Sequence, residues 1–364
     1  MTLVEDLHQR ASEFYAPPAK HGTVQVKVRG KPELDHVYDL GTSLHMQLGQ
    51  VETADAEVTL SAKMVRYILD TATLFEPRSS PYAQTVRVAG DMTLVHHFVQ
   101  LLKRPEPASA ALLADVRRRH VGGETAMQEV DGLDVEAILQ AIVDNRPLCA
   151  RGALNSELIH WSIDDLDRNF GAVALRNNPV TGAMEYFRDI IAAYRSSENN
   201  RLYTSGCTVP DQIMSHFAVP GFADKDFQPA RIWFGRKREG ALVTKLHCDL
   251  TVSFLSQIWG EKRLNLYSPD QYTCFAPVEA YNFYQVCQAD PGAPDYDRFP
   301  QLKNARPIEV SIWPGDLLII PVGWFHCVWA VDDVFSVSRF MEQATAERLH
   351  RSLSVGTMAI EAVA

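Results

Sequence analysis

The stretch TKLHCDLTVSFLSQIWGEKRLNLYSP, residues 244–269, places two chemically active side chains at the spacing of one strand face. His247 and Asp249 are two residues apart, and residues i and i+2 of a β-strand point to the same side. Cys248, between them, points the other way. Because a lone His-x-Asp pair is common by chance, its meaning depends on which other side chains can reach it.

A second histidine, His326, lies in PGDLLIIPVGWFHCVW (314–329). A Pro-Gly-Asp turn precedes an apolar strand there, and a Gly-Trp turn delivers the histidine at the start of the next strand. Two imidazoles and one carboxylate on one side of an octahedral ion form the ligand set of non-haem Fe(II) oxygenases, with three positions open. Those positions suit a chelating 2-oxo acid and O2. We therefore predict that His247, Asp249 and His326 are both the metal ligands and the catalytic centre.

Two further residues near the His-x-Asp pair suggest which 2-oxo acid binds. Lys262, in WGEKRLNLY, begins the next strand in an otherwise apolar neighbourhood. A buried lysine needs a counter-anion, and the distal carboxylate of 2-oxoglutarate would supply one. Thr244, three residues before His247, can donate its hydroxyl to the same carboxylate. The structural alternative is a core in which buried histidines and aspartates satisfy one another.

Composition narrows the class of protein. A chain of 364 residues favours two domains. The net charge of -10, with only short basic clusters such as Arg236–Arg238, argues against a nucleic-acid surface. The acidic, interrupted N-terminus is unlike a signal peptide, and no apolar run approaches the ~20 residues of a membrane span. Six cysteines without a C-x-x-C pair predict reduced thiols in a cytoplasmic protein.

The N-terminal part of the chain predicts a smaller α+β domain over residues 1–105. Segments that alternate apolar and polar residues predict strands at 23–28, 43–48, 56–60 and 85–88. Helical patterns cover 61–75 and 91–102, with Ser61 and Asp91 as expected N-caps. The adjacent His96 and His97 are about 100° apart on a helix and are not expected to share a metal ion.

The rest of the chain divides into three parts. Residues 106–132 predict a helical connector over 107–120 followed by a Gly-rich, polar linker at 121–132. A helix and a short strand near Leu148 open the next part, 133–341, where short strands alternate with Gly, Pro and Asp turns, as in a barrel or sandwich. Trp313 and Trp324 are expected to pack in it. The tail 342–364 predicts a helix that covers a sheet edge or joins a homodimer.

The chemical residues recur in a known order. The pattern T-x-x-H-x-D, QI-x-G-x-KR, PDY-x-RFP, PGD-x-L-x-IP and W-x-H over roughly 134–341 resembles the JmjC-like branch of the cupin superfamily. Within that branch it is similar to the asparaginyl hydroxylases that inhibit hypoxia-inducible factor. The resemblance implies a mainly β catalytic domain, a double-stranded β-helix or jelly roll. It also implies Fe(II) at the triad and binding of the C5 carboxylate of 2-oxoglutarate by Lys262, Thr244 and Tyr203, the last in NNRLYTSG (199–206).

The sequence departs from that family pattern at two positions. The family asparagine near the C1 end of 2-oxoglutarate is Ser253 here, and an asparagine or serine of the last barrel strand aligns with Ser338. Ser338 is followed by a charged residue, Arg339, which is unusual on such a strand. We include Ser253 and Ser338 among the expected 2-oxoglutarate-binding residues.

The N-terminal domain has a resemblance of its own. ADAEVTLSAKMVRYIL (54–69) and AQTVRVAGDMTLVHHFVQLLKRP (83–105) look like the sterol carrier protein type 2 fold, in which a strand leads into a helix and a Gly-Asp turn opens a second helix. Members of that family have an apolar tunnel for lipid-like ligands. The domain could equally serve as a spacer or a dimerisation module.

Together these residues predict an Fe(II)- and 2-oxoglutarate-dependent hydroxylase that uses O2. The resemblance favours a side chain of a peptide or protein, or an amino-acid-derived natural product, as substrate. Two alternatives stay open. One is a carrier of apolar ligands with a non-catalytic cupin barrel, and the other is a Zn or Mn cupin that acts as an isomerase or hydrolase. Succinate formation and dependence on O2 discriminate among the three.

Overall fold

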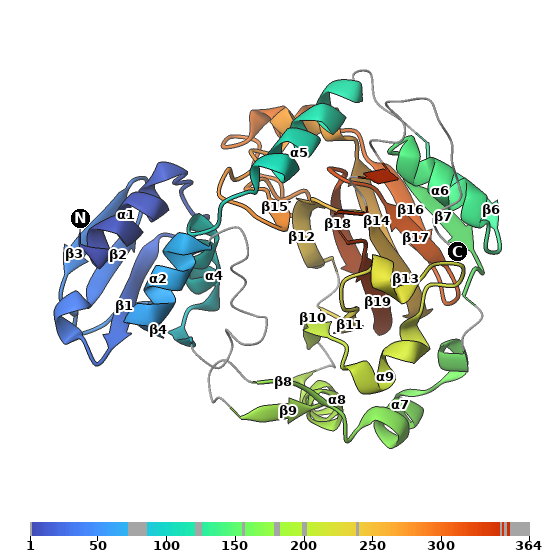
Figure 1. The fold of residues 1–364 in the computed structure, drawn as a ribbon, viewed down its shortest axis with the longest axis horizontal. Coiled ribbons are helices and arrows are strands. Elements are labelled where there is room, and N and C mark those ends of the chain that lie inside the picture. Colours follow the sequence, from blue (N-terminus) through green and yellow to red (C-terminus); the bar gives the residue numbers. More distant parts are fainter. Residues whose placement is uncertain are drawn as a thin grey trace. The chain divides into compact units, whose positions relative to one another are not determined.

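The computed structural model describes residues 2–71, 86–120, 126–154, 157–177, 183–198, 202–237, 240–342, 344–345 and 348–349. The chain divides into two compact units, and Figure 1 shows their elements in sequence colours. The first unit takes in Met1–Ala110, Asn177–Met184 and Pro277–Gln288, and the second takes in the rest. Pro277–Gln288, with the short strand β15 (Tyr284–Val286), is a segment that the sequence analysis placed in the 133–341 domain.

The first unit is built on one five-stranded sheet in the order β3-β2-β1-β4-β5. β1 and β4 pair in parallel and the other neighbours are antiparallel. The strands are β1 (Gly22–Arg29), β2 (His36–Leu40), β3 (Leu44–Leu48), β4 (Ala56–Ser61) and β5 (Arg87–Gly90). The helices are α1 (Leu3–Glu13), α2 (Ala62–Asp70) and α4 (Met92–Leu101).

Local signals explain most of this unit. The Ser61 hydroxyl accepts a hydrogen bond from the Met64 amide at 3.1 Å, and an Asp91 carboxylate oxygen accepts one from the Thr93 amide at 2.8 Å. Both predicted N-caps are therefore confirmed. The helix expected to reach residue 75 ends at Asp70, and residues 72–85 lie outside the described part. The strand β2 and the helix α1 were not predicted.

The second unit contains two β-sheets, as a jelly roll requires. The major sheet has seven strands in the order β10-β11-β19-β13-β17-β7-β6, and the minor sheet contains the run β12-β18-β14-β16. The major-sheet strands are β6 (Gln128–Asp131), β7 (Leu148–Arg151), β10 (Tyr203–Thr208), β11 (Arg231–Gly235), β13 (Ser253–Trp259), β17 (Leu317–Ile320) and β19 (Val334–Phe340). The minor-sheet strands are β12 (Leu242–Asp249), β14 (Lys262–Tyr267), β16 (Ile308–Ile312) and β18 (Phe325–Ala330).

Helices and one small ribbon complete the described part of this unit. The ribbon pairs β8 (Ala174–Asn177) with β9 (Met184–Tyr186), whose residues Asn177 and Met184 are counted in the first unit. The helices are α5 (Pro107–Arg119), α6 (Val135–Val143), α7 (Ile163–Phe170), α8 (Phe187–Ser196) and α9 (Asp211–Met214). No helix among the described residues is long and apolar enough to cross a membrane.

Two hydrophobic cores lie on the two faces of the major sheet. One packs Phe254 and Phe335 against helical residues such as Ile138 and Phe187. The other fills the space between the sheets, with Leu255, Leu318 and Ile320 from the major sheet. From the minor sheet it takes Leu264, Leu266, Ile308, Val310, Ile312 and Val328. We call the faces that meet in this second core the inner faces. The predicted mainly β jelly-roll fold is confirmed.

Two expectations about this unit are wrong, and a third concerns residues that the structure mostly does not describe. Residues 128–131, predicted as linker, form β6 and pair in parallel with β7, a pairing that a short polar segment does not reveal by its pattern. Trp313 does not pack inside. It is 47% exposed in the turn after β16, under the Arg151 guanidinium. Trp324 is fully buried, as predicted. Most of the expected C-terminal helix 342–364 lies outside the described residues.

Candidate metal centre

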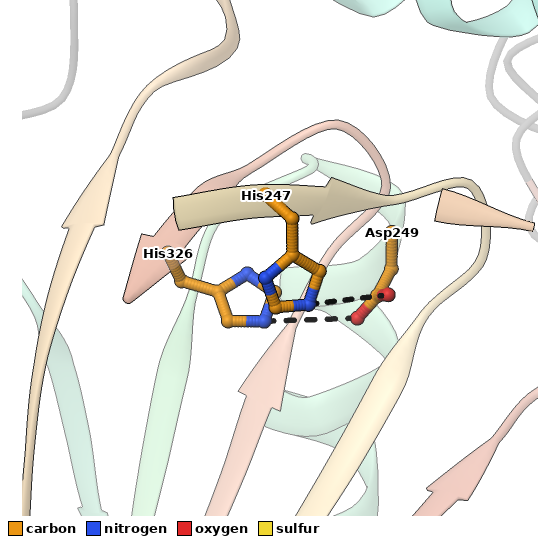
Figure 2. A group of neighbouring side chains, drawn as sticks. All are labelled: His247, Asp249 and His326. Carbon is orange, nitrogen blue, oxygen red and sulfur yellow. Dashed lines mark ion pairs between the residues drawn. The ribbon is translucent and has the colours of Figure 1, made fainter. Parts of the chain in front are cut away.

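The three predicted ligands converge on one point of the inner face of the minor sheet. His247 lies directly opposite His326 across β12 and β18, and Asp249 follows His247 on the same strand face. The Asp249 carboxylate oxygens are 3.8 Å from the Nε2 atoms of both histidines (Figure 2). One donor atom from each residue lies within 4.8 Å of the others, and among the described residues no other group of three His, Cys, Asp or Glu side chains does so.

The histidine rings are oriented for metal binding. His247 Nδ1 is 2.8 Å from the Lys245 carbonyl oxygen, and His326 Nδ1 is 3.1 Å from the Trp324 carbonyl oxygen. A carbonyl oxygen only accepts, so each Nδ1 carries the proton and each Nε2 presents a lone pair toward Asp249. Metal-binding histidines are usually fixed in this manner by a second hydrogen bond. The donor set therefore fits the two-histidine, one-carboxylate iron site.

Burial shifts the pKa values of two of the ligands. Desolvation lowers the pKa of His326 well below its usual value, with a further contribution from His247, so its imidazole stays neutral. Desolvation also raises the pKa of Asp249, while its interactions with His247 and Arg231 act in the opposite direction. A divalent cation would favour the ionised carboxylate and the neutral imidazole, because those are the forms that coordinate.

A β-bulge brings Thr244 to the same face as the ligands. In a regular strand, residues three apart point to opposite sides. Here Thr244 pairs with Val328 and His247 pairs with His326, so β12 has one more residue than β18 over this interval. Since Val328 and His326 share a face, Thr244 and His247 share it too. The bulge therefore explains how a threonine at this odd spacing can reach the site.

Lys262 is buried inside the jelly roll, and the described residues place no counter-charge beside it. It lies opposite Ala330 of β18 and Ile312 of β16, and it is 2% exposed. Desolvation lowers the pKa of its ammonium from 10.5 to about 7. Within the described residues Lys262 forms no ion pair. Its Nζ atom lies 5.8 Å from the centre of the Tyr203 ring and 6.0 Å from that of Trp233. In the described part of the chain two aromatic faces lie near this buried cation, and its burial is unfavourable unless an anion pairs with it.

Tyr203 supplies a second polar group beside Lys262. Its hydroxyl is buried and has no hydrogen-bond partner in the described part of the chain. Burial raises the pKa of this hydroxyl, and the Thr244 hydroxyl lowers it, although the two do not meet the geometry of a hydrogen bond. Lys262, Thr244 and Tyr203 thus lie in one neighbourhood, which is the grouping the sequence predicted for a distal carboxylate.

Ser253 and Ser338 both occupy the inner face of the major sheet. Ser338 pairs with Leu255, a member of the core between the sheets, and Ser253 lies two residues before Leu255. Ser338 accepts a hydrogen bond from Trp233 Nε1 at 2.9 Å. The next residue, Arg339, points to the opposite face, where its guanidinium is 3.0 Å from an Asp224 carboxylate oxygen. The charge of Arg339 is therefore directed away from the space between the two sheets.

Sequence reasoning missed two inner-face residues of β11. Arg231 lies opposite Ser338 and Trp233 opposite Ser336, so both side chains point between the sheets. The Arg231 guanidinium lowers the pKa of Asp249 and lies 5.7 Å from the centre of the Phe340 ring. The alternation in ARIWFG was a usable signal. It did not indicate that β19, about a hundred residues away, would pair with β11.

Comparison with known proteins gives a family match that includes the site, and several relatives. The family model described as a cupin-like domain matches residues 141–346. Lysine-specific demethylase 8 of Xenopus tropicalis is 35% identical over 128 residues, which cover 35% of this chain and 28% of that protein. The tRNA wybutosine-synthesizing protein 5 of Danio rerio is 30% identical over 144 residues, 37% of this chain and 40% of that protein.

A longer and more distant match extends the comparison. Lysine-specific demethylase JMJ21 of Arabidopsis thaliana is 26% identical over 247 residues, covering 61% of this chain and 25% of that protein. Each alignment spans less than half of the relative's length. JmjC-domain proteins of Dictyostelium discoideum also match. The closer likeness to asparaginyl hydroxylases stays a prediction.

Proposed function

The chain belongs to the cupin-like domain family, and from that premise we propose that it is an Fe(II)- and 2-oxoglutarate-dependent oxygenase that hydroxylates an unactivated carbon. The observation that carries the proposal is the convergence of His247, Asp249 and His326, with both Nε2 atoms 3.8 Å from the carboxylate. Three protein ligands on one side of an ion leave positions for a chelating cosubstrate and O2.

The buried lysine distinguishes this proposal from a Zn or Mn cupin. An isomerase or hydrolase with the same metal ligands has no need for a desolvated ammonium inside the barrel. Lys262 is 2% exposed, and the uncompensated burial of its charge is unfavourable in the ligand-free protein. The distal carboxylate of 2-oxoglutarate would neutralise that charge. Fe(II) with 2-oxoglutarate and O2, when bound, supplies the oxidation that yields succinate, CO2 and a hydroxylated substrate.

The residues of this chain would bind and orient the reactants. Lys262, Thr244 and Tyr203 would hold the distal carboxylate, and the apolar residues between the sheets would exclude water from the oxidising centre. Ser253 and Ser338, on the inner face of the major sheet, would contact the rest of the cosubstrate. The half-buried His247 ring marks the side of the ligand set that is nearer to solvent, from which a substrate would approach.

The substrate class is inferred from the relatives and the fold. Two of the relatives are named lysine-specific demethylases and one is named a tRNA wybutosine-synthesizing protein. We propose a side chain of a peptide or protein, or an amino-acid-derived natural product. Nucleic acid is not the proposed substrate because the chain has a net charge of -10.

The role of the first unit, the cellular location and the oligomeric state are further proposals. The first unit combines one β-sheet with helices, which supports the likeness to sterol carrier proteins. The unit would either carry an apolar ligand or mediate assembly. A cytoplasmic location and a homodimer also stay proposals. Measurement of the molecular size of the full chain tests the homodimer. Repeating it with a long-chain fatty acid as probe tests whether an apolar ligand changes the assembly.

A direct experiment tests the proposed reaction. The protein is loaded with Fe(II) and 2-oxoglutarate without oxygen, mixed with a cell extract, and then exposed to O2. Succinate formation and a gain of one oxygen in an extract component are expected. Succinate that requires O2 would exclude the Zn or Mn alternative, whereas no succinate with any extract would favour the non-catalytic carrier.

The lowered pKa of Lys262 predicts a pH-dependent affinity for 2-oxoglutarate. Only the ammonium attracts the distal carboxylate, and burial holds its pKa at about 7 in the free protein. The affinity should be full below pH 7 and fall about tenfold per pH unit above it, until the raised pKa of the bound form is reached. Calorimetric titration of the metal-loaded protein between about pH 6 and pH 9 measures this.

Oxalate and an arginine variant control for that result. Oxalate can chelate the metal but has no distal carboxylate to pair with Lys262, so its affinity should lack this dependence. Lys262→Arg should bind 2-oxoglutarate less tightly but without the loss above pH 7, because the guanidinium stays charged. Equal pH profiles for oxalate and 2-oxoglutarate would contradict the assignment of Lys262.

A further inference from the structure

A short turn between β17 and β18 contacts two of the three metal ligands. We call Pro321–Trp324 the ligand-holding turn. The Gly323 amide donates a hydrogen bond to the Asp249 carbonyl oxygen at 2.9 Å, and the Trp324 carbonyl oxygen accepts from His326 Nδ1 at 3.1 Å. A movement of this turn would therefore displace the backbone of one ligand and rotate the ring of another.

Asn145 binds the same turn from the other side. Trp324 Nε1 donates to the Asn145 carbonyl oxygen at 2.8 Å and to its side-chain Oδ1 at 3.0 Å. Asn145 Nδ2 in turn donates to the Val322 carbonyl oxygen at 3.1 Å. Asn145 is 5% exposed and Trp324 is fully buried, so water competes little with these bonds.

The backbone of Asn145 does not by itself require an asparagine. The residue follows the end of α6 with φ +53°, a conformation that ends many helices and suits glycine best. Glycine would satisfy that turn but would make none of the side-chain bonds to the ligand-holding turn. The Asn145 Oδ1 also lies 2.9 Å from His120 Nε2 of the segment after α5. The side chain thus links three separate segments.

We propose that Asn145 is a positioning residue for the metal centre, which acts through the ligand-holding turn on His326 and Asp249. The inference rests on the proposed function only for the identity of the metal. With the turn fixed, the His326 ring presents Nε2 toward the other donors. Without the Asn145 side chain, Trp324 loses a partner and the carbonyl that orients His326 is free to shift.

Asn145→Gly tests the proposal, with Asp134→Ala as the matched control. Asp134 caps the opposite end of the same helix, where its carboxylate accepts from the Ala137 amide at 2.9 Å. Co(II) is the probe, because its visible spectrum reports coordination geometry and its titration gives the affinity. We expect Asn145→Gly to bind Co(II) roughly 10- to 100-fold more weakly than wild type, with an altered spectrum. Asp134→Ala should melt earlier but bind Co(II) normally.

Trp324→Phe tests the same hydrogen bonds from the other side, in case Asn145→Gly does not fold. Trp324→Phe keeps an aromatic ring and removes the indole N–H, and it should weaken Co(II) binding in the same direction. Native Co(II) affinity and spectrum in whichever of the two variants folds would overturn the positioning role. If wild type binds Co(II) but forms no succinate, the proposed function fails while the affinity ratios still decide the role of Asn145.

Discussion

His326→Ala should abolish 2-oxoglutarate turnover and weaken Fe(II) binding by more than about 100-fold. Loss of a partner that only supports a metal ligand typically costs 10- to 100-fold in affinity or activity, and loss of the ligand itself should cost more. The same result is expected for His247→Ala and Asp249→Ala. Anaerobic Fe(II) titration and succinate formation measure the two effects, and thermal melting shows whether the fold survives.

Lys245→Ala is the matched control for the ligand variants. Lys245 is exposed on the same strand, and its backbone carbonyl, which orients His247, is unchanged by the substitution. The control should retain metal binding and turnover. Full activity in any two of the three ligand variants would refute the metal centre.

Lys262→Ala should raise the apparent KM for 2-oxoglutarate far more than it weakens Fe(II) binding. Removing one partner of a buried, hydrogen-bonded charge pair costs on the order of 2–5 kcal/mol. That corresponds to roughly 30-fold to several thousand-fold in affinity. Lys262→Arg should rescue only in part, since the guanidinium differs in length and shape. Cosubstrate titrations at saturating Fe(II) give the comparison.

Two companion variants separate a binding lysine from a structural one. Thr244→Val should cost less, since a neutral hydroxyl contributes roughly 0.5–1.5 kcal/mol. Lys262→Met keeps the apolar volume and should stabilise the ligand-free protein. A pKa lowered from 10.5 to about 7 corresponds to a cost on the order of 5 kcal/mol. That cost is fully present below pH 7 and disappears as the pH rises toward 10.5. A less stable Lys262→Met with unchanged 2-oxoglutarate affinity would make the lysine structural.

The convergence of the three proposed metal ligands could be predicted because their geometry is mostly local. Alternation on a strand places His247 and Asp249 on one side, and the turn before His326 has a recognisable pattern. Thr244 is different, since its spacing from His247 is wrong for a regular strand. It reaches the site only through a bulge, and nothing in TKLH indicates where an extra residue is accommodated.

Long-range pairing is what the sequence could not provide. Arg231 faces the interior because β11 pairs with β19, more than a hundred residues later. The role of Asn145 could not be predicted for the same reason, because its hydrogen-bond partners, Val322 and Trp324, lie far away in the sequence. The N-caps Ser61 and Asp91 were predictable because each acts on the residues directly after it. Trp313 was misplaced because composition alone does not separate a buried tryptophan from one on a turn.

The direct pairing of His247 with His326 has a mechanical consequence. An ion bound to both would cross-link two neighbouring strands at one rung of their ladder, so a slip of one residue between β12 and β18 would be incompatible with the bound ion. Metal would then select the native register during folding. Its binding energy would also add to global stability, by about 2.7 kcal/mol at a hundredfold excess over Kd. Amide hydrogens of β12 and β18 should exchange more slowly once the ion is bound.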